Sequence, residues 1–252
     1  MYAEERRHAI ADQARRDGRV EVVALATELD VTPETIRRDL SDLERHGVLR
    51  RVHGGAIPAE RFRGELALSD RAGVMAAEKR RIAKTALELV PDAGTVLIDA
   101  GTTTGELAAQ FPERELTVLT NGLPIATQLA VRPDLSVHVL GGRVRDRTLA
   151  VVDAWAMRGI ADLRVDVAFV ATNGISVERG LSTHDPSEAG VKSAMVDAAN
   201  QVVLLADHTK LGQEHLVRYA AIDRVDVLVT DTGISPAAAE EIASAGPKVV
   251  LA

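Results

Sequence analysis

Short apolar segments alternate with segments of helical periodicity through residues 95–251, and this alternation constrains the fold more than any other feature of the chain. The apolar segments, each long enough for one strand, are 95–98, 116–119, 135–140, 165–170, 202–206, 225–229 and 248–251. Candidate helices lie before and between them, at 78–90, 104–110, 124–131, 152–160, 186–199 and 236–244. Strands that alternate with helices predict an α/β domain with a mainly parallel sheet.

Polar residues and glycines follow five of the predicted strands. Ligands of parallel sheets bind outside the carboxyl ends of the strands, so these residues are candidates for one pocket. The first group, 99–105, opens a helix with three threonine hydroxyls and backbone N–H groups, which suits a phosphate. The other groups are 120–122, 141–143, 172–174 and 207–210. Each group alone also has a structural explanation, because Thr caps helices and Asn-Gly forms turns; only their recurrence favours a pocket.

The sequence contains none of the common motifs of catalysis or cofactor binding. No Lys follows the glycines of 101–105 as in a Walker loop, and no G-x-G-x-x-G follows a strand. There is neither a nucleophile elbow nor a helical His-Glu-x-x-His, and His208 with His215 makes a poor metal pair. We therefore expect no catalytic residues, no metal and no cofactor.

Residues 32–46 have the features of a DNA-recognition helix. Thr32 followed by Pro33 is a helix start, because the hydroxyl can accept a backbone N–H and Pro presets the backbone angle. Gly47 ends the helix. One side is an apolar stripe at helical spacing, formed by Ile36, Leu40 and Leu43. The other side carries the charged and polar residues Glu34, Arg37, Arg38, Ser41 and Arg45.

Two further predicted helices, at 4–17 and 22–29, precede this helix, and a turn at 30–32 joins the second of them to it. The segment 48–57 then predicts a small wing with Gly54-Gly55 as its hairpin turn. This order is typical of a helix-turn-helix, whose second helix reads bases in the major groove. We expect these residues to contact duplex DNA: Thr32, Glu34, Thr35, Arg37, Arg38, Ser41, Arg45, Arg50, Arg51 and His53. The last arginines suit phosphates more than bases. The alternatives are a solvated helix face or a protein-binding module.

The charge balance requires that any DNA contact be local. The 252 residues carry a net charge of -7, and residues 1–59 hold ten Arg against eleven Asp and Glu. Aromatic residues are 2 % of the chain, which leaves no platform for stacking single-stranded bases, so duplex DNA is expected. The absence of Cys excludes disulfides and is compatible with a reducing cytoplasm. No apolar segment approaches the ~20 residues of a membrane helix, so we expect a cytoplasmic protein without membrane association.

Several motifs resemble those of the DeoR family of bacterial transcriptional regulators, which are mostly repressors of sugar catabolism. The N-terminal ones are TIRRDL at 35–40, the spacing Leu43-Glu44-x-x-Gly47 and the segment 51–56. The C-terminal ones are Lys79, Asp99-x-Gly101-Thr102-Thr103, Thr120-Asn121, Gly141-Gly142, Gly180-Leu181, Glu188 with Lys192, and Asp207-x-x-Lys210. The resemblance implies a winged helix-turn-helix joined to an effector domain that is similar to ribose-5-phosphate isomerase and CoA transferases. It also implies a phosphorylated sugar or related metabolite as effector.

The expected effector-binding residues combine the strand-end groups with this resemblance. They are Asp99, Gly101, Thr102, Thr103, Thr104, Asn121, Gly141, Gly142, Arg143, Asn173, Glu188, Asp207 and Lys210. The threonines and Lys210 are expected to contact phosphate or hydroxyl groups. The family commonly has Val-Gly where this chain has Val152-Asp153, so Asp153 bears on the size and charge of the pocket.

These observations predict a DNA-binding domain at 1–57, a hinge at 58–75 and an effector and oligomerisation domain at 76–252. One small helix-turn-helix seldom suffices for specific binding, so a homodimer or homotetramer is expected. The favoured hypothesis is a transcription factor whose operator binding responds to a sugar phosphate. The alternative is a sugar-phosphate isomerase or transferase-like enzyme with acid–base groups among Asp99, Glu188, Asp207 and Lys210; such an enzyme has no need of residues 1–57.

Overall fold

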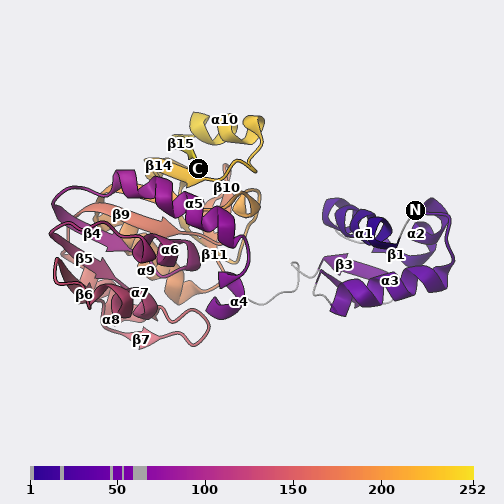
Figure 1. Ribbon diagram of the computed structural model, residues 1–252, viewed down its shortest axis with the longest axis horizontal. Helices are drawn as coiled ribbons and strands as arrows, with labels where there is room; N and C mark the ends of the chain where they lie inside the picture. Colours follow the sequence, from indigo (N-terminus) through magenta and orange to yellow (C-terminus); the bar gives the residue numbers. More distant parts are fainter. Residues whose placement is uncertain (1–2, 18–19, 46–47, 53, 59–66) are drawn as a thin grey trace. The chain divides into compact units, whose positions relative to one another are not determined.

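The computed structural model describes residues 3–17, 20–45, 48–52, 54–58 and 67–252 (Figure 1). By their internal contacts these residues form two compact units, 1–65 and 66–252. Each unit has its own hydrophobic core, and each is described by itself.

The first unit is a three-helix domain with a small antiparallel sheet. Its helices are α1 (Ala3–Asp17), α2 (Val22–Glu28) and α3 (Pro33–Arg45), and its strands are β1 (Val20–Glu21), β2 (Leu49–Val52) and β3 (Gly55–Pro58), in the order β1-β3-β2. The predicted apolar stripe of α3 is confirmed, because Ile36, Leu40 and Leu43 are all buried. They pack against Ile10 of α1 and Leu25 of α2 in one core cluster.

The wing differs from the prediction at its turn. Val52 pairs with Gly55, so Gly55 begins strand β3 and is not a turn residue. A Cβ at Gly55 would lie 2.0 Å from the carbonyl oxygen of Val20 in β1, so only glycine lets the two strands approach. The prediction was wrong because β1 has only two residues and so leaves no recognisable pattern in the sequence. Without β1, nothing indicated that Gly55 would lie against another strand.

The second unit is built on a seven-stranded sheet in which every pairing is parallel. The strand order is β15-β14-β12-β9-β4-β5-β6. The bounds are β4 (Gly94–Ile98), β5 (Leu116–Thr120), β6 (Leu135–Val139), β9 (Val165–Ala171), β12 (Ala199–Leu205), β14 (Val227–Thr230) and β15 (Lys248–Leu251). These are the seven predicted strands, with ends shifted by a few residues, and the α/β prediction is confirmed.

Helices cover both faces of this sheet (Figure 1). Alternate residues of β4 show the two sides: Val96 and Ile98 belong to one core cluster, and Leu97 belongs to the other. The first cluster includes α5 (Ala76–Ala86), α6 (Thr102–Ala109) and α7 (Leu123–Leu129). The second includes α8 (Asp153–Ala161), α9 (Pro186–Ala198) and α10 (Pro236–Ser244). Since both faces are buried, the strands are apolar throughout, as parallel strands usually are.

In the second unit, the elements that the sequence did not predict are all short. They are the helix α4 (Leu68–Ala72), the 3-10 turns η2 (Leu87–Leu89), η3 (His208–Lys210) and η4 (Ile222–Arg224), the hairpin of β7 (Arg143–Val144) with β8 (Val151–Val152), and a small antiparallel sheet of β10 (Gly174–Ser176), β11 (Gly180–Thr183) and β13 (Val217–Ala220). Helix α4 lies within the segment that was expected to be a hinge. Among the described helices, none is long and apolar enough to cross a membrane.

Candidate functional site

Helix α3 presents the expected DNA-contacting residues on its solvent side. Thr32, Glu34, Arg37 and Arg38 are exposed, and Thr35 and Ser41 are half-buried. The hydroxyl of Thr32 accepts the backbone N–H of Thr35 at 3.2 Å, which fixes the first turn of the helix. The buried stripe on the opposite side anchors α3 in its domain, so these six side chains share one accessible face.

The acidic residues of α3 are distributed unevenly about the helix. Asp39 is buried and accepts Arg6 of α1 at 2.6 Å, and Asp42 accepts Arg7 of α1 at 2.9 Å. Both carboxylates therefore face α1. Glu34 differs, because it pairs with Arg37 at 3.2 Å on the exposed face. In the part of the chain that the structure describes, no residue makes a hydrogen bond or ion pair with Arg38.

Four expected contacts cannot be placed on this face. His53 and the side chains of Arg45, Arg50 and Arg51 lie outside the described residues.

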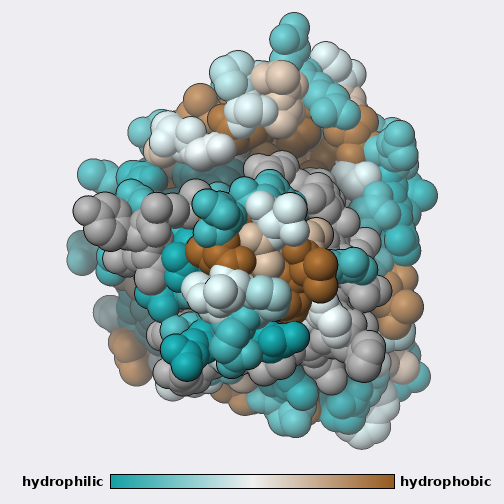
Figure 2. Space-filling view, turned by 90° about the vertical axis from the view of Figure 1, so that its right-hand side faces the viewer, coloured by the Kyte–Doolittle hydropathy of each residue, from teal (hydrophilic) through white to brown (hydrophobic). Residues whose placement is uncertain are grey.

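The surface in Figure 2 is mostly hydrophilic and has a small apolar group near its centre. Val23 of α2, at 71 % exposure, is the most exposed large apolar side chain described in the first unit.

The centre of the second unit's candidate site is a buried ion pair at the carboxyl end of β4. Lys192 Nζ of α9 donates to Asp99 Oδ2 and, at 2.9 Å, to the carbonyl of Ala171. Asp99 Oδ2 also accepts the backbone N–H of Ala171 at 3.0 Å. Burial raises the pKa of Asp99 even though Lys192 opposes the shift. Asp99 Oδ1 is buried and has no hydrogen-bond partner among the described residues.

Glu188 lies one turn before Lys192 on α9 and is also held within the protein. Its Oε1 accepts Thr148 Oγ1 at 2.5 Å and Arg145 Nη1 at 2.6 Å. Burial alone would raise the pKa of Glu188, but Lys192, Thr148 and Arg145 outweigh it and the pKa is lowered. Glu188 is therefore a carboxylate at neutral pH, and it holds the 145–148 loop against α9.

Asn121 follows β5 and braces the turn that leads from β4 into α6. Its Oδ1 accepts the N–H of Ala100 at 2.7 Å, and its Nδ2 donates to the carbonyl of Val151 at 3.3 Å. A Cβ at Gly101 in the same turn would lie 2.9 Å from Thr104 Oγ1, so glycine permits the tight path. The expected ligand residue Asn121 thus has a structural role in shaping the site.

A cavity of about 310 Å³ opens above this turn, and two of the expected effector residues, Gly101 and Thr102, line it. Its other walls come from α4, α6, α7 and the 145–148 loop: Leu68, Ala72, Ala100, Gly105, Glu106, Ala109, Gly122, Pro124, Ile125, Gln128 and Thr148. Thr103 and Thr104 are buried residues of the first turn of α6, and Thr104 Oγ1 has no hydrogen-bond partner among the described residues. The cavity is of the size that small-molecule ligands occupy.

A cluster of cations lies at the carboxyl end of β12. Lys79 of α5 is 4 % exposed, and its Nζ donates to the carbonyl of Arg71 of α4 at 2.7 Å. Burial lowers the pKa of Lys79 to about 8; Asp207 raises it and Lys210 lowers it, so all three residues lie close together. Asp207 accepts the N–H of Thr209 at 3.1 Å, which shapes the turn that carries Lys210.

The sequence analysis did not predict that His208 pairs with Asp231 at the carboxyl edge of the sheet. His208 Nδ1 lies 2.7 Å from Asp231 Oδ1, and the N–H of His208 donates to Asp231 Oδ2 at 2.8 Å. A Cβ at Gly233 would lie 2.3 Å from His208 Nδ1, so the ring packs where only glycine leaves room. Asp231 directly follows strand β14, so it could have been grouped with the other strand-end residues.

Four expected effector residues lie elsewhere on this side of the unit. Gly141, Gly142 and Arg143 are exposed at the start of the β7–β8 hairpin, and Asn173 accepts Thr183 Oγ1 at 2.8 Å beside β11. None of the four lines the cavity. Asp153 adopts a left-handed backbone with φ of 79°, where glycine is favoured, and accepts Arg143 Nε at 2.6 Å. Its carboxylate therefore pairs at the surface and is not a wall of the cavity.

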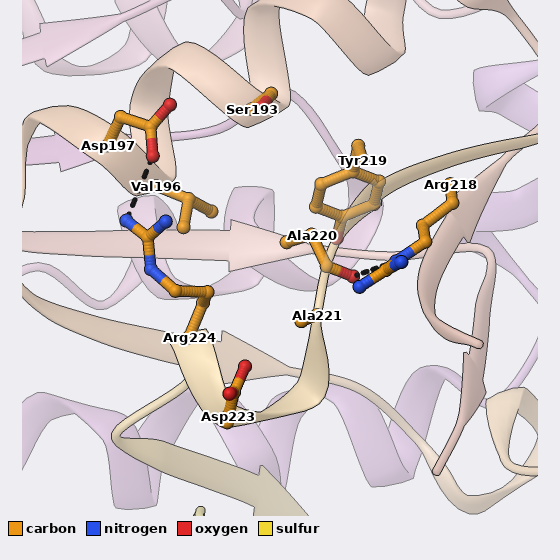
Figure 3. Close-up of a pocket in the computed structure, with 9 residues that line it drawn as sticks. All are labelled: Ser193, Val196, Asp197, Arg218, Tyr219, Ala220, Ala221, Asp223 and Arg224. Atoms are coloured by element: carbon orange, nitrogen blue, oxygen red, sulfur yellow. Dashed lines mark hydrogen bonds and ion pairs between the residues drawn. The ribbon is translucent and has the colours of Figure 1, made fainter. Parts of the chain in front are cut away.

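A second cavity of about 370 Å³ lies between the end of α9 and the segment from β13 to η4. Figure 3 shows that its two guanidinium groups are engaged within the chain, Arg224 with Asp197 at 2.9 Å and Arg218 with the carbonyl of Ala220 at 3.5 Å. None of the expected effector residues lines it, and its charges are balanced. The cavity at the β4–α6 turn, which Gly101 and Thr102 line, is the better candidate for the effector site.

Comparison with known proteins connects the two units to one family. Residues 6–62 match the DeoR-like helix-turn-helix domain, and residues 74–232 match the DeoR C terminal sensor domain. The chain is 37 % identical over 252 residues to the HTH-type transcriptional regulator GlpR of Haloferax volcanii, covering 99 % of this chain and 98 % of that protein. It is 31 % identical over 233 residues to the Glycerol-3-phosphate regulon repressor of Escherichia coli, covering 92 % of each.

Among solved structures, a ribose 5-phosphate isomerase of Methanocaldococcus jannaschii matches 54 % of this chain and 55 % of its own, at 16 % identity and a TM-score of 0.41. A likeness at this level has no bearing on activity. The two domain matches and the full-length relatives do establish the family. The chain belongs to the DeoR family, whose members are DNA-binding transcriptional regulators and not enzymes.

Proposed function

We propose that this regulator represses an operon of sugar or sugar-phosphate metabolism and that a phosphorylated metabolite, bound at the β4–α6 turn, changes its affinity for operator DNA. The face of α3 formed by Thr32, Glu34, Thr35, Arg37, Arg38 and Ser41 reads the operator. Dimers or tetramers of the chain match the two-fold symmetry of palindromic operators. The relatives support a repressor, because one of them is the Glycerol-3-phosphate regulon repressor.

Two observations support the phosphate proposal: the cavity at the N-terminus of α6, and the buried Lys79, which interacts electrostatically with Glu106 of the cavity wall. The cavity is lined by Gly101 and Thr102 at the N-terminus of α6, where backbone N–H groups and the helix dipole favour an anion. Lys79 is buried close to Lys210 and has a pKa of about 8. An anion that binds beside a buried lysine stabilises its ammonium form, so the interaction favours binding of the anion. The site thus favours a dianionic phosphate over a neutral sugar.

A thermal-shift screen tests this proposal. The full chain is mixed with glycerol 3-phosphate, other three- to six-carbon sugar phosphates, the same sugars without phosphate, and inorganic phosphate. A ligand at about 100 times its Kd stabilises the native state by about 2.7 kcal/mol, which raises the Tm of a unit of this size by roughly 5–10 °C. We expect such a shift from at least one phosphorylated sugar and none from its dephosphorylated form. Equal shifts from both forms would contradict the phosphate proposal.

Binding of the best phosphorylated ligand is expected to weaken above pH 8. Bound phosphate raises the pKa of Lys79 from its lowered value, so above pH 8 binding must take up a proton and the affinity falls by up to about tenfold per pH unit. Below pH 6 the affinity falls again, because the second ionisation of the phosphate has a pKa of about 6. Isothermal titration from pH 5.5 to 9.5 measures this profile.

Lys79→Met provides the matched comparison. It should weaken binding at pH 7 by about tenfold or more and remove the decline above pH 8. Lys84→Met changes an exposed lysine of the same helix and should leave the profile unchanged. A decline above pH 8 that persists in Lys79→Met would assign the titration to another group.

A further inference from the structure

Helix α8 has an apolar solvent face, which is unusual for a surface helix. Its inner side is buried through Ala156 and Ile160. Its other side exposes Trp155 at 71 % and Met157 at 42 %, together with Ala154, Arg158 and Ala161. Trp155 is the only tryptophan of the chain. Surface helices ordinarily present charged and polar residues to water, so this face is expected to be covered by another surface.

The hairpin that precedes α8 in the chain exposes two further apolar side chains. Strand β8 leads directly into α8 and pairs with β7, where Val144 is 41 % exposed. Leu149, in the loop between the two strands, is 39 % exposed. Tryptophan, methionine and arginine are the residue types most enriched in protein interfaces. We call the exposed surface of α8 formed by Trp155, Met157, Arg158 and Asp162 the α8 patch.

Two opposite charges on α8 have no partner within the described part of the chain. Arg158 and Asp162 are one helical turn apart and both exposed, yet neither side chain makes a hydrogen bond or an ion pair with another described residue. Asp162 is the C-cap residue of α8, where the helix dipole disfavours a negative charge. A cation supplied from outside the chain would compensate that cost.

We propose that the α8 patch is the two-fold interface between two copies of this chain. In a two-fold interface the same surface is used twice, so it must be complementary to itself. Two α8 helices packed antiparallel bring Arg158 of one copy to Asp162 of the other, and the reverse pair forms by symmetry. Their dipoles are then opposed, and Trp155 and Met157 bury apolar surface on both flanks. A neutral patch with one unpaired base and one unpaired acid fits a second copy better than a strongly charged partner.

The proposal rests on the proposed function only for the expectation that the chain self-associates. The solitary Trp155 makes the test direct, because the fluorescence of the full chain reports on this one position. We expect that concentrating the protein shifts the emission to shorter wavelength and protects Trp155 from acrylamide quenching at least threefold. The shift should follow the same midpoint as the doubling of mass in sedimentation velocity.

Charge reversals test the two-fold pairing. Arg158→Asp and Asp162→Arg should each raise the dimer dissociation constant at least tenfold, and the double variant should return to within about threefold of wild type. Leu216→Ser changes a side chain that is 73 % exposed at the start of β13 and should have no effect. Circular dichroism checks that each variant is folded.

The outcomes separate this proposal from the proposed function. A wild-type chain that dimerises while Trp155 stays equally quenchable at every concentration overturns the α8 interface but leaves a dimeric regulator. Single reversals that leave the dissociation constant within a factor of two overturn it as well. A chain that stays monomeric at all concentrations and on DNA contradicts both the interface and the proposed dimer.

Discussion

Arg38→Ala is expected to lower specific operator affinity by about thirtyfold or more while the domain stays folded. Arg38 is exposed on α3 and has no partner among the described residues, so its guanidinium is available to guanine. One bidentate contact to a base contributes about 1–3 kcal/mol, and a dimer loses the contact in both half-sites. Arg37→Ala should act in the same direction but less strongly, because Arg37 starts from an ion pair with Glu34 at 3.2 Å.

Fluorescence anisotropy with a duplex selected by the wild-type protein from a random pool measures this effect. Salt must be fixed and then varied, because phosphate contacts alone change the slope of affinity against salt. Arg80→Ala, an exposed arginine of α5, is the control and should bind as wild type. If Arg38→Ala kept wild-type affinity at every salt concentration, α3 would not be the recognition helix.

Lys192→Met is expected to lower the free energy of unfolding by about 3–5 kcal/mol. The variant leaves Asp99 buried without its cation, and removing one partner of a buried pair costs much more than the pair contributes. It also removes the main attraction that lowers the pKa of Glu188, so two buried carboxylates are affected. Urea unfolding followed by circular dichroism gives the difference.

The sign of the pH dependence follows from Asp99. Without Lys192, burial raises the pKa of Asp99 still further above the usual 3.8, so the folded variant holds a proton that the unfolded chain releases. Stability is then fully present below about pH 4 and is lost as pH rises, so the deficit should be smaller at pH 5 than at pH 8. The double variant Asp99→Asn with Lys192→Met should recover more than half of the loss. No recovery would mean that packing of the Lys192 stem, and not charge, is responsible.

The large elements of this fold were predictable because burial on both faces of a parallel sheet leaves an unmistakable pattern. Strands β4 and β9 are apolar along nearly their whole length, and the helices between the strands carry periodic apolar residues. The short elements β1, α4 and β7 could not be predicted. Their conformation depends on tertiary partners, as when Leu68 of α4 donates its N–H to the carbonyl of Arg147, and not on local periodicity.

The sequence could predict that the candidate site lies at one edge of the sheet, but not what each residue of the site does. Since parallel strands end at the same edge, Asp99, Asn121 and Asp207 had to lie near one another. Their roles depend on contacts that sequence does not contain. The side-chain amide of Asn121 makes hydrogen bonds to the backbone through both its oxygen and its nitrogen. Asp99 pairs with Lys192 of α9, which lies 93 residues later in the sequence. The position of Lys79 depends in the same way on α4, an element that the sequence did not reveal.

We propose that a phosphorylated metabolite bound to the second unit controls DNA binding by the first. The most direct test is the operator affinity of the full chain measured by anisotropy with and without a saturating amount of the best phosphorylated ligand. We expect the operator affinity to change roughly 5- to 150-fold, with an equal change in ligand affinity when operator is present, because coupling between two sites is reciprocal. Lys79→Met should reduce the response. An operator affinity that is the same with and without a ligand shown to be bound would contradict the account.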